Sequence, residues 1–378
     1  MYLFVYRDFI VGGCELLVEK IGSVLVSYGE RVGVLCKTMD PLMGERFSNR
    51  KMEIAMLPDW SGLTEEIESF DCQESMNIVT FLWRSFYPCY SAKRRNKRTI
   101  FYGVNWEAFT GDLIGVGTLK GKGREYCAGI VERFLKRGNF IAMDDMTIQC
   151  AQELYGQAMH IGKEDYEVIY ISVDTSGVEP VNREQVIQNF KQPRILTISR
   201  ADFSMKGYLI GLLDWFSKTK EEIYLDIVTY GPDEGTVKKI INGLPADKRN
   251  RISLYGKTEY EELDEIIKRS LIYVGMGTTL LDSTERGIIS IPVEAFTDKL
   301  ITSGFFTEHY ELLGTFGQGK DFEELVRGVL AMSIDEYLKH SEYGLEVVRE
   351  HYDLRRNTKR LQVYFSSLPE DETEKGGW

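Results

Sequence analysis

The sequence predicts a doubly wound α/β protein with two domains, and three observations carry this prediction. The chain has 378 residues, more than one hydrophobic core usually serves, so two domains of about 150–200 residues are expected. Short apolar runs recur along both halves, as expected for strands buried on both faces of a parallel sheet. Stretches with helical periodicity separate these runs, and that alternation is typical of parallel sheets flanked by helices.

The N-terminal segment shows the pattern as strand, helix and strand. Residues 2–6 are apolar and β-favouring, and Gly12 and Gly13 end the run. Apolar side chains at helical spacing follow over residues 16–25, and residues 32–36 form the next strand. The segment therefore predicts a βαβ unit. Further strands of the first half are expected at 76–82, 99–104, 139–142 and 167–171.

A second series of alternating elements begins at residue 194. The segment 174–192 contains Gly177 and Pro180 and little strand pattern, so it is expected to link the two domains. One long charged helix is expected near the end, over roughly 343–367, before a polar, acidic tail over 369–378. The strands of the second half are expected at 194–198, 224–229, 251–254, 271–274 and 288–292, and the parts of the chain at 1–175, 176–350 and 351–378.

The composition limits the classes of function. The formal net charge is -12, and an acidic chain repels a polyanion, so no nucleic-acid partner is expected. Six cysteines and four histidines are scattered without metal-ligand spacing, so neither a disulfide scaffold nor a metal site is expected. The first residues lack the features of a signal peptide, and no run of about 18 apolar residues occurs, so a cytoplasmic location is expected.

The most informative segment is LIYVGMGTTLLDSTERG, residues 271–287. A buried strand is followed by Gly275 and Gly277 and then by a helix, so backbone N–H groups and the electropositive helix start can hold a phosphate. Thr278 and Thr279 can cap this helix and donate hydroxyl groups, and Asp282 lies one turn further on. A glycine turn that serves only tight strand–helix packing explains the same residues.

A second segment of the same kind is SRADFSMKG, residues 199–207. It also follows a strand and precedes a helix, and both loops are expected at the carboxyl edge of one sheet, where ligands bind. Arg200 and Lys206 would then converge on an anion and stabilise a leaving diphosphate. Surface cations that pair with Asp202 and its neighbours are the alternative. The glycines of VGGCE, residues 11–15, are either a third ligand-facing loop or a simple βα turn.

Aromatic and basic residues concentrate in FLWRSFYPCYSAKRRNKR, residues 81–98. The stretch from Trp83 to Arg98 could contact an anionic membrane surface or a lipid-linked acceptor. A core-packed helix followed by a solvated basic loop is the alternative, and it is preferred.

Taken together, these segments resemble the retaining GT-B-fold glycosyltransferases of the family-4 type, also called glycosyl transferases group 1. The resemblance covers nearly the whole chain, and it implies two Rossmann-like domains with a cleft between them and a final helix, within 351–378, that packs back on the first domain. It also implies transfer from a nucleotide sugar, with UDP as the expected nucleotide, to a glycan, lipid-linked or protein acceptor. The segments that carry it are VGGCELLVEKIGSVLVSYGERVGVLC, EVIYISVDTSGVEP, ILTISRADFSMKG, DIVTYGPDEGTVKKII, RISLYGKTEYEEL and HYDLRRNTKRLQVYFSSL.

The resemblance assigns roles to particular residues. Arg200 and Lys206 match the ligands of the donor diphosphate, and Asp282 matches the second acid of the family's paired acidic motif, which binds the donor ribose. We therefore expect Arg200, Lys206 and Asp282 to be the catalytic residues. The segment around Tyr255 and Gly256 matches the one whose backbone reads the nucleotide base. The remaining donor-binding residues expected are Gly13, Ser199, Gly231, Gly275, Met276, Gly277, Thr278 and Thr279.

Two departures from the family pattern bear on catalysis. The first acid of the paired motif is replaced by Val274, so Glu107 or Glu285 substitutes for it, or catalysis rests on diphosphate stabilisation, or the chain is a non-catalytic partner of an active glycosyltransferase. The family histidine of the acceptor side is absent, and Asn105 or Glu107 is the candidate there. A nucleotide-sugar epimerase of the same architecture is a further alternative.

Overall fold

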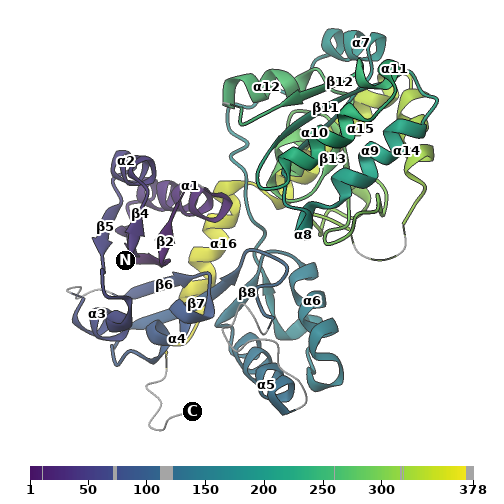
Figure 1. Cartoon of the computed structure of the whole chain (residues 1–378). Helices are drawn as coiled ribbons and strands as arrows, with labels where there is room; N and C mark the ends of the chain where they lie inside the picture. The colour runs from purple at the N-terminus through teal and green to yellow at the C-terminus, as the bar shows by residue number, and fades with distance from the viewer. Residues whose placement is uncertain are drawn as a thin grey trace. The chain divides into compact units, whose positions relative to one another are not determined.

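The computed structural model describes residues 1–10, 12–70, 75–110, 122–258, 260–315, 317 and 319–371. The chain forms two compact units. The first comprises residues 1–174 together with the C-terminal section from Leu354 onward, and the second comprises residues 175–353. The chain thus passes between the units twice, at 174–175 and at 353–354 (Figure 1).

The first unit contains a seven-stranded parallel sheet in the order β5-β3-β1-β6-β7-β8-β9. Strands β3 and β5 add to one side of β1, and β6 and the later strands add to its other side. The strand order therefore reverses between β1 and β6. The strands are β1 (Tyr2–Val5), β3 (Val32–Cys36), β5 (Glu53–Met56), β6 (Met76–Thr80), β7 (Lys97–Gly103), β8 (Phe140–Ala142) and β9 (Glu167–Val168), with β2 (Asp8–Phe9) and β4 (Thr38–Met39) in a small second sheet.

Helices of the first unit flank this sheet (Figure 1). Helix α16, the last helix among the described residues, packs against α1 and so belongs to this unit. The helices are α1 (Gly13–Ser27), α2 (Pro41–Asn49), α3 (Leu63–Ser69), α4 (Trp83–Ser91), α5 (Lys122–Lys136), α6 (Asp145–Tyr155) and α16 (Leu354–Ser367), with 3-10 turns η1 (Trp60–Gly62), η2 (Gly156–Ala158) and η3 (Lys163–Asp165).

The second unit contains a five-stranded parallel sheet in the order β12-β11-β10-β13-β14. Strand β10 is central: it pairs with β11 along its whole length and with β13 on its other side. The strand order therefore reverses between β10 and β13, which is where open parallel sheets bind ligands. The strands are β10 (Arg194–Arg200), β11 (Tyr224–Tyr230), β12 (Ile252–Tyr255), β13 (Ile272–Gly275) and β14 (Ile289–Pro292).

The helices of the second unit form two layers. Helix α9 packs against α10, while α15 packs against α7 and α13. The helices are α7 (Arg183–Lys191), α8 (Phe203–Lys206), α9 (Tyr208–Lys218), α10 (Glu234–Asn242), α11 (Ala246–Arg249), α12 (Tyr260–Lys268), α13 (Thr278–Thr284), α14 (Phe322–Leu330) and α15 (Ile334–His351), with the 3-10 turn η4 (Phe306–Glu308).

The single helix expected over 343–367 is wrong, because α15 ends at His351 and α16 begins at Leu354. Two tertiary contacts hold the break. The backbone N–H of Leu354 donates to the carbonyl of Val173 at 3.0 Å, and the hydroxyl of Thr175 donates to Asp353 at 2.9 Å. Helical periodicity continues across the break, but these long-range bonds replace the local helical ones.

Candidate functional site

Two loops follow the strands at which the order of the second sheet reverses. The first leads from β10 to α8 and carries Arg200 and Lys206, and the second leads from β13 to α13 and carries Gly275 and Gly277. Because β10 and β13 are parallel neighbours, both loops lie at the same edge of the sheet. The structure therefore brings together the two segments that the sequence singles out.

The loop after β10 is fixed by the loop after β11. The N–H of Ala201 donates to the carbonyl of Tyr230 at 2.7 Å, and the N–H of Asp233 donates back to the carbonyl of Ala201 at 3.0 Å. Gly231 makes this close approach possible: its φ is +132°, and a Cβ there would lie 2.7 Å from the Ala201 carbonyl oxygen. Its role in the described structure is to shape the neighbouring loop.

Arg200 and Lys206 are the cations of this edge. Arg200 is exposed, at the end of β10. Lys206 is the last residue of α8, and burial lowers the pKa of its ammonium group to about 8, against an opposing effect of nearby Asp202. Neither side chain forms a hydrogen bond or salt bridge within the described part of the chain. A desolvated cation without such a partner is typical of an anion-binding site.

The loop after β13 differs in detail from expectation. The residue that caps α13 is Gly277, with a φ of +75° and no side chain to offer. The expectation that Thr278 or Thr279 caps the helix is therefore wrong. The hydroxyl of Thr279 lies 2.5 Å from the hydroxyl of Tyr273, so it is engaged inside the unit. Thr278 is exposed, and the side chain of Met276 is buried.

The acidic residues of α13 and its end are in different environments. Asp282 is partly exposed. Glu285, by contrast, is 4% exposed and accepts from Arg286 at 2.8 Å, and Arg286 also donates to Asp264 at 2.6 Å. The hypothesis that Glu285 replaces the missing acid is therefore not supported by its surroundings. Val274 is fully buried within β13.

An ion-pair network supports the end of β12, where Tyr255 and Gly256 lie. The guanidinium of Arg269 donates to the hydroxyl of Tyr255 and to fully buried Asp226 at 2.8 Å. Arg194 donates to the same carboxylate at 3.0 Å. Sequence reasoning missed Asp226 and Arg269, although an aspartate inside the apolar strand YLDIVTY is a signal that a buried partner exists. Gly256 is exposed, and Ser199 is half-buried.

The candidate residues of the first unit lie in loops after β1 and β7. Gly13 is the first residue of α1, and a Cβ there would meet nothing within 4 Å. The side chain of Asn105 accepts from the N–H of Glu107 at 3.0 Å, so it stabilises its own turn, while Glu107 is exposed. Glu15, which sequence reasoning missed, is 4% exposed, and burial raises the pKa of its carboxyl group.

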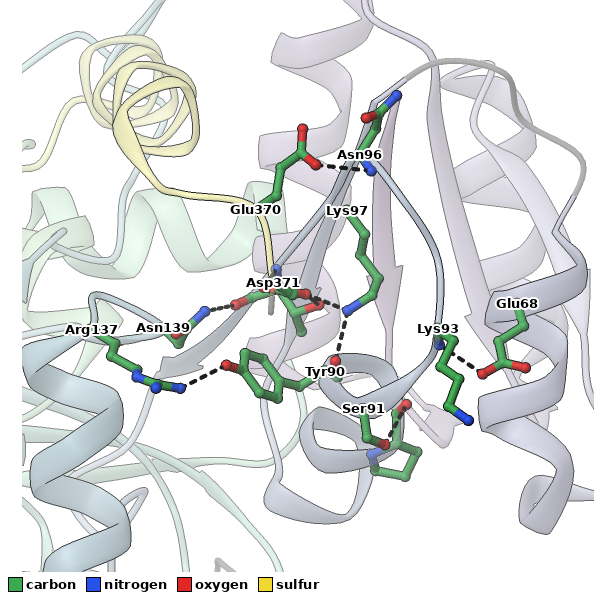
Figure 2. A network of polar contacts seen from close by, with 12 residues as sticks. Glu68, Tyr90, Ser91, Lys93, Asn96, Lys97, Arg137, Asn139, Glu370 and Asp371 are labelled. Atoms are coloured by element: carbon green, nitrogen blue, oxygen red, sulfur yellow. Dashed lines mark hydrogen bonds and ion pairs between the residues drawn. The ribbon is translucent and has the colours of Figure 1, made fainter. Parts of the chain in front are cut away.

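Many side chains of the basic and aromatic segment from Trp83 to Arg98 are packed inside the first unit. Phe86 and Tyr90 are buried in a core of aromatic rings, with the ring of Phe86 5.0 Å from that of Phe134. Lys97 points toward Asp371 (Figure 2), and its ammonium nitrogen lies 2.5 Å from a carboxylate oxygen of that residue. These aromatic rings are therefore not available to a membrane surface, which corrects the expectation for them. The exposed basic side chains that remain are Arg84, Lys93 and Arg95.

The C-terminal tail departs from expectation as well. The sequence predicts a polar, acidic tail over 369–378, but Asp371 is one of the most buried carboxylates of the first unit, with 1% of its side chain exposed. Residues 372–378 lie outside the described residues. Within the described residues, no helix combines the length and apolar character needed to cross a membrane.

The sequence matches no protein-family model, and no curated protein matches it in sequence. Solved structures do match over nearly the whole chain. A glycosyltransferase from Rickettsia africae superposes with a TM-score of 0.67 at 16% identity, over 97% of each chain. HepE of Anabaena, solved with UDP-glucose, gives 0.68 at 13% identity, over 97% of this chain and 99% of its own.

A third match is the lipopolysaccharide outer core galactosyltransferase WaaB in its apo form. It superposes with a TM-score of 0.64 at 14% identity and covers 97% of this chain and 99% of its own. These likenesses show the fold. The chain has the GT-B architecture of two Rossmann-like units, as the sequence predicts.

Proposed function

We propose that this protein is a glycosyltransferase that moves a hexose from a nucleotide-sugar donor, with UDP as the nucleotide, and that the second unit binds the donor. One observation carries the proposal: Arg200 and Lys206 stand without a salt bridge or hydrogen bond to any described residue at the edge where the order of the second sheet reverses. A diphosphate supplies the negatively charged partner that these two side chains do not have among the described residues. The UDP and UDP-glucose bound to HepE of Anabaena support the choice of nucleotide.

The chemistry follows from the position of the cations. As the bond between the sugar and the diphosphate breaks, negative charge accumulates on the departing phosphate. Arg200 and Lys206 stabilise that charge, and they do so more strongly in a desolvated site than in water. We propose that Asp282 binds hydroxyl groups of the donor, that the backbone of Tyr255 and Gly256 contacts the base, and that the N–H groups of Thr278 and Thr279 contact the diphosphate.

The remaining parts of the proposal concern the reaction partners. We propose transfer with retention to a glycan, lipid-linked or protein acceptor, bound by the first unit near Asn105 and Glu107. We also propose that transfer needs no metal ion, because the two cations already supply the positive charge. Unchanged transfer in the presence of EDTA is the expected result, and a loss of transfer that Mg²⁺ or Mn²⁺ restores would contradict it.

The test is a calorimetric titration of the purified chain with UDP, UDP-glucose, UDP-galactose and UDP-N-acetylglucosamine. Because a hydrogen bond to a charged group contributes about 1.5–3 kcal/mol, Arg200→Ala is expected to weaken UDP binding about 10- to 100-fold. Arg249→Ala is the control, since Arg249 is exposed at the opposite, amino edge of the same sheet, just before β12. Equal UDP affinity in wild type and Arg200→Ala would remove the proposed diphosphate site.

A second candidate function rests on Val274. This residue is fully buried in β13, so no carboxylate stands at that position. A glycosyltransferase-like subunit that binds donor but relies on a catalytic partner is consistent with this environment. Release of UDP from a UDP-sugar by the chain alone would exclude that role, whereas UDP binding without turnover, together with activity in the presence of a co-purified partner, would support it.

A further inference from the structure

The loop that follows β14 presents an aromatic side chain to solvent. Phe296 is 47% exposed, and no contact between its ring and another aromatic ring occurs among the described residues. The loop begins at the same sheet edge as the proposed diphosphate site, because β14 pairs in parallel with β13. Its first residue, Val293, donates its N–H to the carbonyl of Gly275 at 3.1 Å.

The backbone of Phe296 has a conformation that this residue type avoids. Its φ is +60°, and among the described non-glycine residues only Lys51 and Asn96 share a positive φ. Lys51 follows the end of α2, where left-handed residues are common, and asparagine tolerates that region. A bulky residue with positive φ outside such a position is an outlier. Strained residues of this kind concentrate at ligand-binding sites.

Contacts with Met205 of α8 and with Gly207, between α8 and α9, hold the backbone of this loop in its conformation. The N–H of Phe296 donates to the carbonyl of Met205 at 2.9 Å. Gly207 allows Thr297, the residue after Phe296, to approach, because a Cβ at Gly207 would lie 2.6 Å from the carbonyl oxygen of Thr297. The hydrogen-bonded partner, Met205, immediately precedes Lys206. The backbone of Phe296 is thus fixed beside the residue that precedes the cation that we assign to the diphosphate.

We propose that Phe296 is a specificity residue for the donor: its ring packs against the sugar that is attached to the diphosphate. The inference rests on the proposed function. In a nucleotide sugar the glycosyl group is bonded directly to the phosphate that Lys206 would hold, so the sugar must lie next to that lysine. The C–H face of a hexose is apolar, and an aromatic ring is the protein surface that suits it. The hydrogen bond to Met205 holds the backbone of Phe296 at this edge of the sheet.

The test uses two substitutions with opposite structural effects. Phe296→Gly removes the ring and relieves the positive φ, so it is expected to raise or preserve the melting temperature. It is also expected to reduce the advantage of a UDP-sugar over UDP, measured by calorimetry as a ratio of affinities, about three- to tenfold, while UDP binding is unchanged. Phe296→Tyr keeps a ring and is expected to preserve the ratio. Tyr343→Ala, which removes an exposed ring from α15, is the control for nonspecific effects.

The outcomes separate this inference from the function on which it rests. The UDP-sugar is whichever of UDP-glucose, UDP-galactose and UDP-N-acetylglucosamine the wild type binds most tightly. If Phe296→Gly binds UDP and that UDP-sugar as the wild type does, Phe296 has no role in sugar recognition and the proposed function stands. If the wild type binds neither UDP nor any UDP-sugar, both proposals fail. A lower melting temperature for Phe296→Gly together with an unchanged affinity ratio would show that the ring serves packing.

Discussion

The ammonium nitrogen of Lys97 lies 2.5 Å from a carboxylate oxygen of Asp371, although the two residues are 274 positions apart. Each side chain is 1% exposed. The same carboxylate accepts from the N–H of Thr99 at 3.0 Å and from its hydroxyl at 2.6 Å, and Lys97 also donates to the carbonyl of Tyr90 at 2.8 Å (Figure 2). This pair fastens the segment after α16 to β7.

We expect Asp371→Ala to destabilise the first unit, because the substitution leaves the charge of Lys97 buried without its partner. The expected loss is about 3–5 kcal/mol of unfolding free energy. Urea denaturation, with hydrogen exchange of the β7 amides to identify the unit, measures it. Glu370→Ala is the matched control: Glu370 accepts from the N–H of Asn96 at an exposed position. Equal stabilities of the two variants would show that the buried pair contributes little.

We expect UDP binding to depend on the protonation of Lys206. Burial lowers the pKa of this ammonium to about 8, so above pH 8 the free protein loses the charge and UDP affinity falls, by up to about tenfold for each pH unit. Calorimetry between pH 6.5 and 9.5 measures this. Lys206→Arg keeps its charge and is expected to flatten the profile. A wild-type profile as flat as that of the variant would exclude Lys206 from the site.

The same pKa predicts the pH dependence of stability. The folded-state pKa of Lys206 lies below 10.5, the ordinary pKa of an exposed lysine. Between pH 8 and 10.5 the unfolded chain therefore binds more protons than the folded chain, so this residue makes stability rise with pH. Relative to Lys206→Met, the wild type is expected to gain stability across that interval. Parallel stability profiles for the two proteins would contradict the shift.

We expect Gly231→Ala to weaken UDP binding, although the substitution removes no side chain that we assign to UDP. A Cβ at this position would lie 2.7 Å from the carbonyl oxygen of Ala201, and the φ of +132° is strained for alanine. The loop that carries Arg200 must then move. Gly235→Ala is the control, because nothing lies within 4 Å of a Cβ there and the residue is helical. It is expected to be neutral or to stabilise by up to about 1 kcal/mol.

We expect Asp282→Asn and Glu285→Gln to have contrasting effects. Asp282 is partly exposed near the proposed donor site, so its loss should lower donor turnover while the melting temperature changes little. Glu285 is paired with buried Arg286, so its substitution should cost about 1–3 kcal/mol of stability and leave UDP affinity unchanged. Turnover and thermal unfolding, measured on both variants, decide the assignment. A reversal of the two patterns would make Glu285 the functional acid.

Much of the fold could be predicted because it depends on local pattern. Apolar runs such as residues 32–36 and 224–229 are buried strands in the structure, as the alternation predicts. The two loops at the reversal of the second sheet could also be located, since glycines and cations directly follow strand ends. The break between α15 and α16 could not be predicted, because bonds from Val173 and Thr175 create it.

The charges show the limit of sequence reasoning most clearly. Lys97 belongs to a run of basic residues, and the run by itself indicates an exposed surface. The sequence by itself determined the alternation of strands and helices in both halves and the loops that carry glycines and cations after strand ends, because periodicity and turn chemistry act over a few neighbouring residues. Only the tertiary structure decided which charged side chains form ion pairs. Lys97 pairs with Asp371, and Glu285 pairs with Arg286. Arg200 and Lys206 form no such pair within the described residues. A buried charge loses its contact with water and needs an oppositely charged partner, and that partner can lie at any distance along the sequence.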